Sequence, residues 1–463
     1  MNDPTGAPLM LSISGARGIV GESMTPAVAE RFAAAFGSYL RETTGRADPV
    51  FCLGRDSRPS GERLGAAAAV GLFSAGGRTV DLGVVTTPSV AVMVDALGAA
   101  GGLVVTASHN PLPWNGLKCL LAGGVAPPPE QMDRIIDRFT APDVSPGGAS
   151  RTPPPQRDDS AHERHVARVL DHVDPGPVRV AGFTVVLDSV NGAGGAPGRM
   201  LLERLGCAVV HENGEPTGEF AHPPEPTEAN LAQLGPVVAA RGAAAGFAQD
   251  PDADRLAIID ERGTYIGEEC TLVLAAKRLL DREGGGPLVV NLSTSRMIDD
   301  LAARYPGASV IRTPVGEANV AAAMQAAGAL VGGEGNGGVI FPPVCRVRDS
   351  LTAMALVLEL MAAEGRPLSA IVADLPRYHM IKHSFRLQAG GEAAPAVAIQ
   401  RVVSRFADRR LNTEDGVRAD FDDGWIHLRP SNTEPIVRLI VEAETPQRAR
   451  ALLDEVAAAA GLV

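Results

Sequence analysis

Aromatic residues are scarce in this 463-residue chain, where Phe, Trp and Tyr together make up 4% of the sequence. Surfaces that stack the bases of single-stranded nucleic acid depend on such rings, so their scarcity argues against that function. Positive charge is also in deficit, because 42 Lys and Arg residues face 54 Asp and Glu residues, a formal net charge of −12. A chain this acidic does not hold a nucleic-acid backbone over a broad surface. An anionic substrate must therefore be bound by local positive charge.

Cysteine pairs and long apolar runs are missing as well. The five cysteines are scattered, odd in number and never spaced as C-x-x-C, which favours reduced core residues over a disulfide framework or a zinc site. No apolar run reaches the roughly 18 residues that a membrane span requires. The N-terminus has no basic region followed by an apolar one, so no signal peptide is expected. We therefore expect a cytoplasmic protein that does not associate with a membrane.

The sequence does contain enough apolar residues for sizeable cores. Hydrophobic residues make up 45% and charged residues 21%, and the length predicts three or more domains. Near the N-terminus, Thr25-Pro26 is a helix start and Gly45 a helix end, with apolar residues at helical spacing between them. Short apolar strands are expected over 50–53 and 103–106. Strands separated by helices indicate a mostly parallel α/β sheet.

The same alternation continues along the chain after a segment rich in Pro, Gly and Ser at 141–157, which is expected to be a surface loop or linker. Further strands are expected over 184–187, 244–247 and 287–291, and further helices over 294–305, 317–327 and 446–460. From about residue 380 the pattern changes to a smaller α+β unit. The sequence therefore predicts three α/β units and one smaller C-terminal unit.

A polar segment, Thr106-Ala107-Ser108-His109-Asn110-Pro111, follows the expected strand at 103–106. A serine exposed where a strand ends is a candidate nucleophile, and Lys118 lies close enough in sequence to reach the same place. Taken alone, the segment is equally well interpreted as a polar turn.

Three carboxylates at alternate positions, Asp250, Asp252 and Asp254, follow another apolar strand. They can direct their oxygens to one centre, as magnesium or calcium requires, whereas an acidic turn would place three repelling charges together. A calcium-binding helix-loop-helix is excluded, because Arg255 occupies the position of its invariant glycine and a strand follows.

Two more segments carry polar groups suited to a phosphosugar. In Gly332-Gly333-Glu334-Gly335-Asn336-Gly337-Gly338, Glu334 and Asn336 can bind hydroxyls, although a merely flexible loop is also possible. The second segment is Arg429-Pro430-Ser431-Asn432-Thr433-Glu434-Pro435, followed by Arg438. Its arginines, hydroxyls and backbone amides suit a phosphate dianion, and the alternative is an ordinary turn with an ion pair.

Together and in this order, the four segments resemble the α-D-phosphohexomutase family, with its T-A-S-H-N-P, D-x-D-x-D-R, G-E-containing and R-x-S-x-T-E-P loops. Ser14-Gly15-Ala16-Arg17-Gly18 and Gly54-Arg55-Asp56-Ser57-Arg58 resemble flanking family motifs, so the resemblance extends over about residues 10 to 445. It implies an α/β fold of three α/β domains with mixed sheets and a smaller C-terminal α+β domain around a central cleft. The implied domains are 1–157, 158–260, 261–378 and 379–463, which carry the phosphoserine, metal, sugar and phosphate loops in turn.

The resemblance also implies a mechanism. Phosphorylated Ser108 donates its phosphoryl group to a hexose phosphate, the resulting 1,6-bisphosphate turns over in the cleft, and its other phosphate returns to Ser108. One Mg²⁺ is held by the phosphoserine at Ser108 and by Asp250, Asp252 and Asp254, and a hexose 1,6-bisphosphate acts as activator. The remaining implied roles are assistance at the phosphoserine by Arg17 and Lys118, binding of sugar hydroxyls by Glu334 and Asn336, and binding of the distal phosphate by Arg429, Ser431, Asn432, Thr433 and Arg438.

The form of the sugar and phosphate loops, with Thr313-Pro314-Val315-Gly316-Glu317-Ala318-Asn319, is most similar to archaeal-type phosphoglucosamine mutases. Members that act on glucose or mannose phosphates usually carry Ser at position 336 and His at position 338, where this chain has Asn336 and Gly338. The preferred substrate is thus expected to be glucosamine 6-phosphate, with a phosphoglucomutase/phosphomannomutase as the alternative. A phosphoserine-dependent sugar phosphatase and a non-catalytic sugar-phosphate binder are less favoured. The general acid–base group has no assignment, because the histidine is missing.

Overall fold

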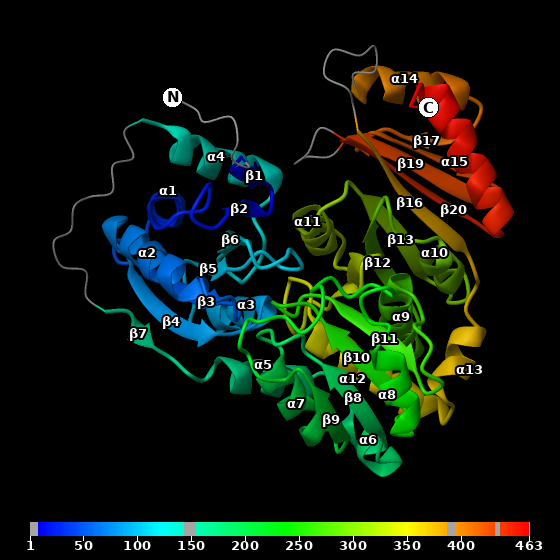
Figure 1. Ribbon diagram of the computed structural model, residues 1–463, viewed down its shortest axis with the longest axis horizontal. Coiled ribbons are helices and arrows are strands. Elements are labelled where there is room, and N and C mark those ends of the chain that lie inside the picture. Colours follow the sequence, from blue (N-terminus) through cyan, green and yellow to red (C-terminus); the bar gives the residue numbers. More distant parts are fainter. Residues whose placement is uncertain (1–7, 143–153, 387–394, 431–435, 463) are drawn as a thin grey trace.

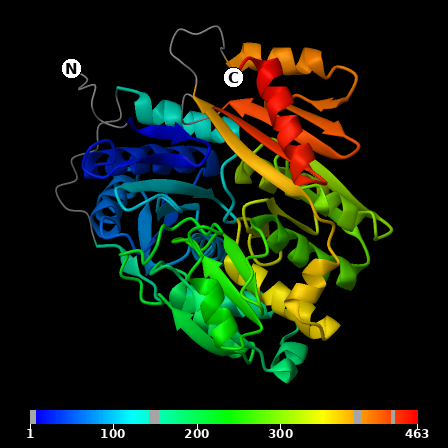
Figure 2. The ribbon, with the colours of Figure 1, turned by 45° about the vertical axis from the view of Figure 1, so that its right-hand side comes forward.

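The computed structural model describes residues 8–142, 154–386, 395–430 and 436–462. These residues form four sheets, each built from one continuous stretch of the chain. We name the sheets with their helices units I to IV in chain order. The units follow one another in an arc, with unit I (blue) and unit IV (orange and red) at its two ends (Figures 1 and 2).

Unit I is a mixed seven-stranded sheet in the order β1-β2-β6-β5-β3-β4-β7. Strand β3 is parallel to β4 and β5, whereas β6 is antiparallel to β5 and β2. The strands are β1 (Met10–Ser12), β2 (Gly15–Ile19), β3 (Val50–Arg55), β4 (Arg78–Val84), β5 (Gly101–Val105), β6 (Trp114–Leu121) and β7 (Gln156–Arg157). The helices are α1 (Pro26–Thr44), α2 (Gly61–Ser74), α3 (Thr87–Ala96) and α4 (Pro129–Thr140).

Units II and III are four-stranded sheets of similar design, ordered β11-β10-β8-β9 and β13-β12-β14-β15. In each sheet three strands are parallel and one edge strand, β11 or β15, is antiparallel to its neighbour. Unit II comprises α5 (Ala161–Leu170), α6 (Pro175–Ala181), β8 (Thr184–Asp188), α7 (Gly195–Arg204), β9 (Ala208–Glu212), α8 (Leu234–Ala240), β10 (Ala245–Gln249) and β11 (Leu256–Asp260). Unit III comprises α9 (Glu268–Glu283), β12 (Gly286–Asn291), α10 (Met297–Ala302), β13 (Ala308–Thr313), α11 (Glu317–Ala327), β14 (Val331–Glu334), β15 (Gly338–Ile340), α12 (Ser350–Glu364) and α13 (Leu368–Ala373).

Unit IV is the smaller α+β unit, an antiparallel five-stranded sheet in the order β16-β20-β19-β18-β17 with two helices. It comprises β16 (His379–Arg386), α14 (Pro395–Arg405), β17 (Arg410–Asn412), β18 (Val417–Phe421), β19 (Gly424–Pro430), β20 (Ile436–Ala443) and α15 (Pro446–Ala460). The predicted architecture of three α/β units with mixed sheets and a smaller C-terminal unit is thereby confirmed.

The mixed sheets have a direct consequence for the four polar segments. In units I, II and III the segment connects a parallel strand to its antiparallel neighbour, at the β5–β6, β10–β11 and β14–β15 connections. In unit IV it connects β19 to β20. Each segment is therefore a connection between paired strands, which fixes its two ends through the sheet.

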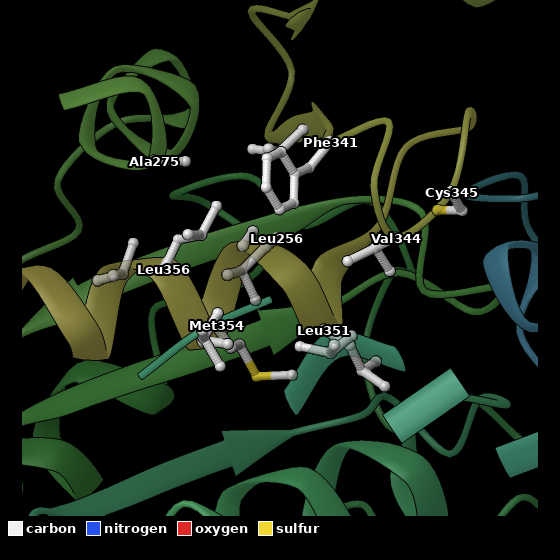
Figure 3. Packing of buried hydrophobic residues seen from close by; sticks show 14 of the residues in the cluster. Leu256, Ala275, Phe341, Val344, Cys345, Leu351, Met354 and Leu356 are labelled. Atoms are coloured by element: carbon white, nitrogen blue, oxygen red, sulfur yellow. The ribbon is translucent and has the colours of Figure 1, made fainter. Parts of the chain in front are cut away.

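One hydrophobic cluster joins the first three units, each of which also has a cluster of its own, whereas the fourth unit adds no residue to the joint cluster. One buried cluster includes residues of units I, II and III, and helix α12 lies within it with both its faces buried. Figure 3 shows Leu351, Met354 and Leu356 of this helix packed with Leu256 of unit II and Phe341 of unit III. The buried residues of unit IV form a cluster of their own between its sheet and helices α14 and α15.

Two predictions of helix ends are confirmed in α1. The Thr25 side chain accepts a hydrogen bond from the Val28 amide, and Gly45 ends the helix in the left-handed conformation with φ 65°. No helix among the described residues is long and apolar enough to cross a membrane.

Two other predictions need correction. The helix expected over 294–305 is only Met297–Ala302, because side chains before it bind the local backbone: Asn291 Oδ1 accepts from the Ser293 amide and Ser295 Oγ from the Met297 amide. The linker expected over 141–157 ends in a strand, since β7 pairs with β4. Residues 143–153 of that linker lie outside the described residues.

Candidate active site

The Ser108 segment is tightly held where β5 ends. Ser108 is 2% exposed and its φ of 49° is left-handed, a conformation that costs energy for any residue with a side chain. Its amide donates to Thr106 Oγ1 at 2.9 Å, and its own Oγ donates to Asp250 Oδ2 at 2.8 Å. The serine of unit I thus lies in hydrogen-bond contact with the acidic segment of unit II.

Arg58 supports this loop, a role that sequence reasoning missed. It is fully buried, and its guanidinium donates to the carbonyl oxygens of Ser108 and Asn110 at 2.6 Å and to two further loop carbonyls at 3.0 Å. Its Nε donates to Asp56 Oδ2 at 3.0 Å, so all five N–H groups are used. The Gly54–Arg58 motif pointed to this region of the sequence, but it does not reveal which backbone carbonyls the arginine binds.

The three aspartates converge as expected of a cation site. Asp250, Asp252 and Asp254 are fully buried, and one carboxylate oxygen of each lies within 4.8 Å of the others. Oδ1 of Asp252 and Oδ1 of Asp254 are buried without a hydrogen-bond partner among the described residues. Buried carboxylate oxygens without partners are costly, and a hard cation with oxygen ligands satisfies them. The donor set therefore fits a divalent metal ion.

The pKa values within this triad diverge. Burial and the charges of Asp254 and Asp252 raise the pKa of Asp250. At Asp254, Arg348 and Lys118 outweigh burial and hold the pKa well below its usual range. Lys118 donates to Asp252 Oδ2 at 2.6 Å and to Asp254 Oδ2 at 2.9 Å, and these two carboxylates raise its pKa against burial. A charged ammonium is thereby held beside the acidic cluster.

Two further residues of unit I orient the site. Arg17, another predicted site residue, donates to Asn110 Oδ1, and burial lowers its pKa. Thr87, which sequence reasoning missed, donates from its side chain to Asp252 Oδ2 at 2.6 Å and from its amide to the Asp252 carbonyl at 3.0 Å. Arg17 therefore holds the Ser108 segment, and Thr87 holds the acidic segment against unit I.

The sugar segment brings Glu334 to the same region with both carboxylate oxygens occupied. Oε1 accepts from Asn291 Nδ2 at 2.9 Å and from the Gly316 amide at 3.2 Å, and Oε2 accepts from Arg348 at 2.7 Å. Asn336 Nδ2 is 3.5 Å from Oε2 of Glu334, and its Oδ1 is buried without a partner among the described residues. Asn336 therefore carries a buried acceptor that the described residues do not satisfy.

Arg348 links the metal and sugar segments, and the sequence offered no motif that would reveal it. Its guanidinium pairs with Asp254 at 2.6 Å and with Glu317 and Glu334 at 2.7 Å each. Its side chain lies over Gly338, where an added Cβ would be 2.2 Å from Arg348 Cδ. Glycine at position 338 therefore leaves the space that Arg348 occupies.

The predicted phosphate residues lie partly outside the described residues. Ser431, Asn432 and Thr433 fall within 431–435, which the structure does not describe. Arg429 and Arg438 are directly paired positions of β19 and β20, and Arg429 binds Asp415 Oδ2 at 2.9 Å. Both arginines line the same cavity.

Two adjoining cavities bring together many of these groups, with Arg255 representing the acidic segment. The smaller, about 310 Å³, is lined by Arg17, Ser108, Lys118, Glu317, Arg348 and other residues of units I to IV. The larger, about 470 Å³, is lined by Glu225, Lys382, His383, Arg429 and other residues of units II to IV. Val315, Glu334, Asn336 and Arg438 line both. The described residues of all four predicted segments thus contribute to one cleft.

Comparisons with known proteins agree along the whole chain. Four models described as phosphoglucomutase/phosphomannomutase domains match in order: alpha/beta/alpha domain I at residues 10–144, domain II at 163–263, domain III at 268–378 and the C-terminal domain at 388–459.

Individual relatives give the same result. The chain is 37% identical to a phosphoglucomutase/phosphomannomutase of Thermococcus kodakarensis, over 95% of this chain and 96% of the relative. It is 38% identical to a probable phosphoglucosamine mutase of Methanopyrus kandleri, over 96% and 95%. Among solved structures, a phosphoglucomutase/phosphomannomutase family protein from Burkholderia thailandensis superposes with a TM-score of 0.83 at 28% identity, with 98% of each chain covered.

Proposed function

The chain belongs to the phosphoglucomutase/phosphomannomutase family and is a phosphohexomutase, and on that premise we propose that it converts glucosamine 6-phosphate to glucosamine 1-phosphate. The name of the Methanopyrus kandleri relative supports this substrate, as does the form of the sugar segment with Asn336 and Gly338. The name of the Thermococcus kodakarensis relative supports the second candidate, a phosphoglucomutase/phosphomannomutase.

In this proposal Ser108 carries the phosphoryl group. The main support for this role is the 2.8 Å hydrogen bond from Ser108 Oγ to Asp250 Oδ2. It holds a serine hydroxyl at the edge of a buried cluster of three carboxylates. Lys118, which lines the same cavity as Ser108, would assist at the phosphoserine through its positive charge. Arg17 and Arg58 hold the loop that presents the serine.

Asp250, Asp252 and Asp254 would hold one Mg²⁺, with an oxygen of the phosphoserine as a further ligand. The two unpartnered buried oxygens of Asp252 and Asp254 support this, because oxygen-only sites are those that Mg²⁺ prefers. When bound, the ion supplies positive charge that offsets the charge developing on the transferring phosphoryl group.

The rest of the cleft would hold the sugar and its second phosphate. Glu334 and Asn336 bind sugar hydroxyls, and Arg429 and Arg438, with Ser431, Asn432 and Thr433, bind the phosphate that is not reacting. The location of both arginines along the 470 Å³ cavity supports this division. The intermediate is a hexose 1,6-bisphosphate, and added bisphosphate serves as activator. The free state of all five cysteines supports a cytoplasmic location.

A panel assay tests this function. The purified protein is incubated with Mg²⁺, a trace of the matching 1,6-bisphosphate and the 6-phosphate of glucosamine, glucose or mannose, and both 1-phosphate and free phosphate are measured. We expect the highest kcat/KM for glucosamine 6-phosphate. A higher value for glucose or mannose phosphate would transfer the assignment to the second candidate, and release of free phosphate without 1-phosphate would make the protein a phosphatase.

A further inference from the structure

Glu317 faces the reacting end of the cleft. It is the first residue of α11, its side chain is 16% exposed, and it lines the smaller cavity together with Ser108 and Lys118 of unit I. Glu334 and Asn336 of the sugar segment line the same cavity. The Glu317 carboxylate therefore shares one cavity with the serine and the sugar-binding groups.

One oxygen of this carboxylate is fixed and the other is available. Oε2 accepts a hydrogen bond from Arg348 Nε at 2.7 Å. Oε1 makes no hydrogen bond with the described part of the chain, and unlike Oδ1 of Asp252 and of Asp254 it is not closed off from the cavity. A carboxylate held at one oxygen and open at the other has the arrangement of a proton acceptor.

Four other titratable groups along the described cleft are less suited to this task. Both oxygens of Glu334 already accept hydrogen bonds, and Lys118 is bound to two aspartates. Arg255 and burial lower the pKa of His109 to about 2, which makes its imidazole a very weak base. Glu225 is 48% exposed and lines the larger cavity, beside Arg255.

We propose that Glu317 is the general acid–base of the mutase reaction. In the first half-reaction the sugar hydroxyl attacks phosphorus, its O–P bond forms, the P–Oγ bond to Ser108 breaks, and the hydroxyl proton passes to Glu317. In the second, Ser108 attacks the other phosphate, and Glu317 returns its proton to the sugar oxygen that leaves. The Ser108 oxygen takes up one proton from solvent in the first half-reaction and releases it in the second, so protons balance over the cycle. This inference rests on the proposed phosphoserine mechanism.

The charges around Glu317 suit a group that must both take up and release a proton. Burial raises the pKa of its carboxyl, and Arg348 opposes that shift most strongly. Asp254 and Glu334 add to the rise, whereas Lys118 reduces it. The remaining charged groups that line the same cavity are Arg17, Arg255 and Arg438.

Arg348 is the positioning residue in this arrangement. Its Nε fixes Glu317, while its terminal nitrogens bind Asp254 and Glu334, so the acid–base group is tied to the metal and sugar segments. Gly338 permits this, because any Cβ there would collide with the Arg348 side chain. The missing side chain at position 338 thus makes room for the Arg348 side chain that holds Glu317.

Substitutions at position 317 test the proposal. Glu317→Gln retains a hydrogen-bond acceptor for Arg348 but cannot carry the proton, so we expect kcat to fall by about 10²- to 10⁴-fold with little change in KM. The acidic limb of the wild-type pH–rate profile should disappear in this variant. Glu317→Ala should regain activity with added formate in a saturable manner, because formate can occupy the vacated position beside Arg348. Glu261→Gln, a partly exposed Glu that binds Ser369, is the matched control and should behave as wild type.

Three outcomes distinguish a failure of the role proposed for Glu317 from a failure of the phosphoserine mechanism. A Glu317→Gln enzyme whose kcat and pH profile match wild type, or a Glu317→Ala enzyme that is inactive and does not respond to formate, overturns the role of Glu317. Mass spectrometry of wild-type protein treated with the bisphosphate checks the phosphoserine independently. If phosphate is never found on Ser108 and Ser108→Ala remains active, the proposed mechanism itself fails, whatever position 317 does.

Discussion

Ser108 and Asp250 are 142 residues apart in the chain, and yet the serine hydroxyl donates a 2.8 Å hydrogen bond to the aspartate carboxylate. The contact joins the β5–β6 connection of unit I to the β10–β11 connection of unit II. It brings the candidate phosphoryl carrier and the candidate metal ligands within one hydrogen bond of each other. The predictions below begin from this contact.

Ser108→Ala should abolish mutase activity and leave the fold intact, because the proposed carrier is lost while removal of one buried hydrogen bond costs about 1–3 kcal/mol, less than the stability of a typical folded protein. Activity is followed with glucosamine 6-phosphate, and circular dichroism reports the fold. Ser189→Ala, which removes a buried serine of unit II that binds His211, is the control and should retain activity. Wild-type rates in Ser108→Ala would exclude the phosphoserine mechanism.

Asp252→Asn should weaken Mg²⁺ binding and reduce kcat, because one negative oxygen fewer lowers the attraction for a hard cation. Isothermal titration of Mg²⁺ into the purified protein measures binding apart from activity. Asp260→Asn, in a buried carboxylate at the end of β11 that accepts hydrogen bonds from the Arg262 and Thr264 amides, is the control. Full activity of the wild-type enzyme in excess chelator would contradict the metal site.

Arg438→Ala should raise KM more than it lowers kcat, because a phosphate contact of this kind is made in the ground state as well as in the transition state. Loss of a charge-assisted contact typically costs about 1.5–3 kcal/mol, which corresponds to a rise in KM of roughly 10- to 150-fold. More bisphosphate should also escape into solution, measured by quenched-flow analysis. An unchanged KM with no additional escape would show that this arginine is structural.

Glu269→Gln should change how stability depends on pH. Burial raises the pKa of Glu269 from 4.5 to about 8, so between these values the folded protein keeps a proton that the unfolded chain has lost. The free energy of unfolding is therefore unaffected by Glu269 ionisation below about pH 4.5, and it decreases as the pH rises from there towards 8. The variant should gain stability relative to wild type over that range, on the order of a few kcal/mol at pH 8.

Thermal midpoints of wild type and Glu269→Gln at several pH values between 4.5 and 8.5 check this expectation. Glu283→Gln, in a half-exposed residue at the end of α9, should show no pH-dependent difference from wild type. A constant offset between Glu269→Gln and wild type at every pH would mean that Glu269 is ionised in the folded protein.

The order of units and the four polar segments could be predicted from the sequence because each signal is local. Asp250 and Glu334 come at or directly after apolar strands, and the ends of α1 are marked by Thr25 and Gly45. The short strand β7 could not be predicted, because its pairing with β4 depends on a distant partner.

The supporting arginines and Glu317 escaped prediction for a similar reason. Arg348 is an isolated charged residue in the sequence, and its importance comes from three carboxylates on other segments, including Asp254, 94 residues away. Arg58 binds backbone carbonyls, which any sequence would supply. Only the folded chain shows that such residues converge.

The separate core of unit IV has a consequence for how the molecule unfolds. Units I, II and III are coupled through one joint buried cluster, so they should lose amide protection together, whereas unit IV adds no residue to that cluster and can open as an independent cooperative element. Transient opening of that element would carry Arg429 and Arg438 away while Ser108 and the aspartates remain enclosed. Hydrogen exchange should therefore detect two protection levels, and a bound phosphosugar should raise the lower one towards the higher.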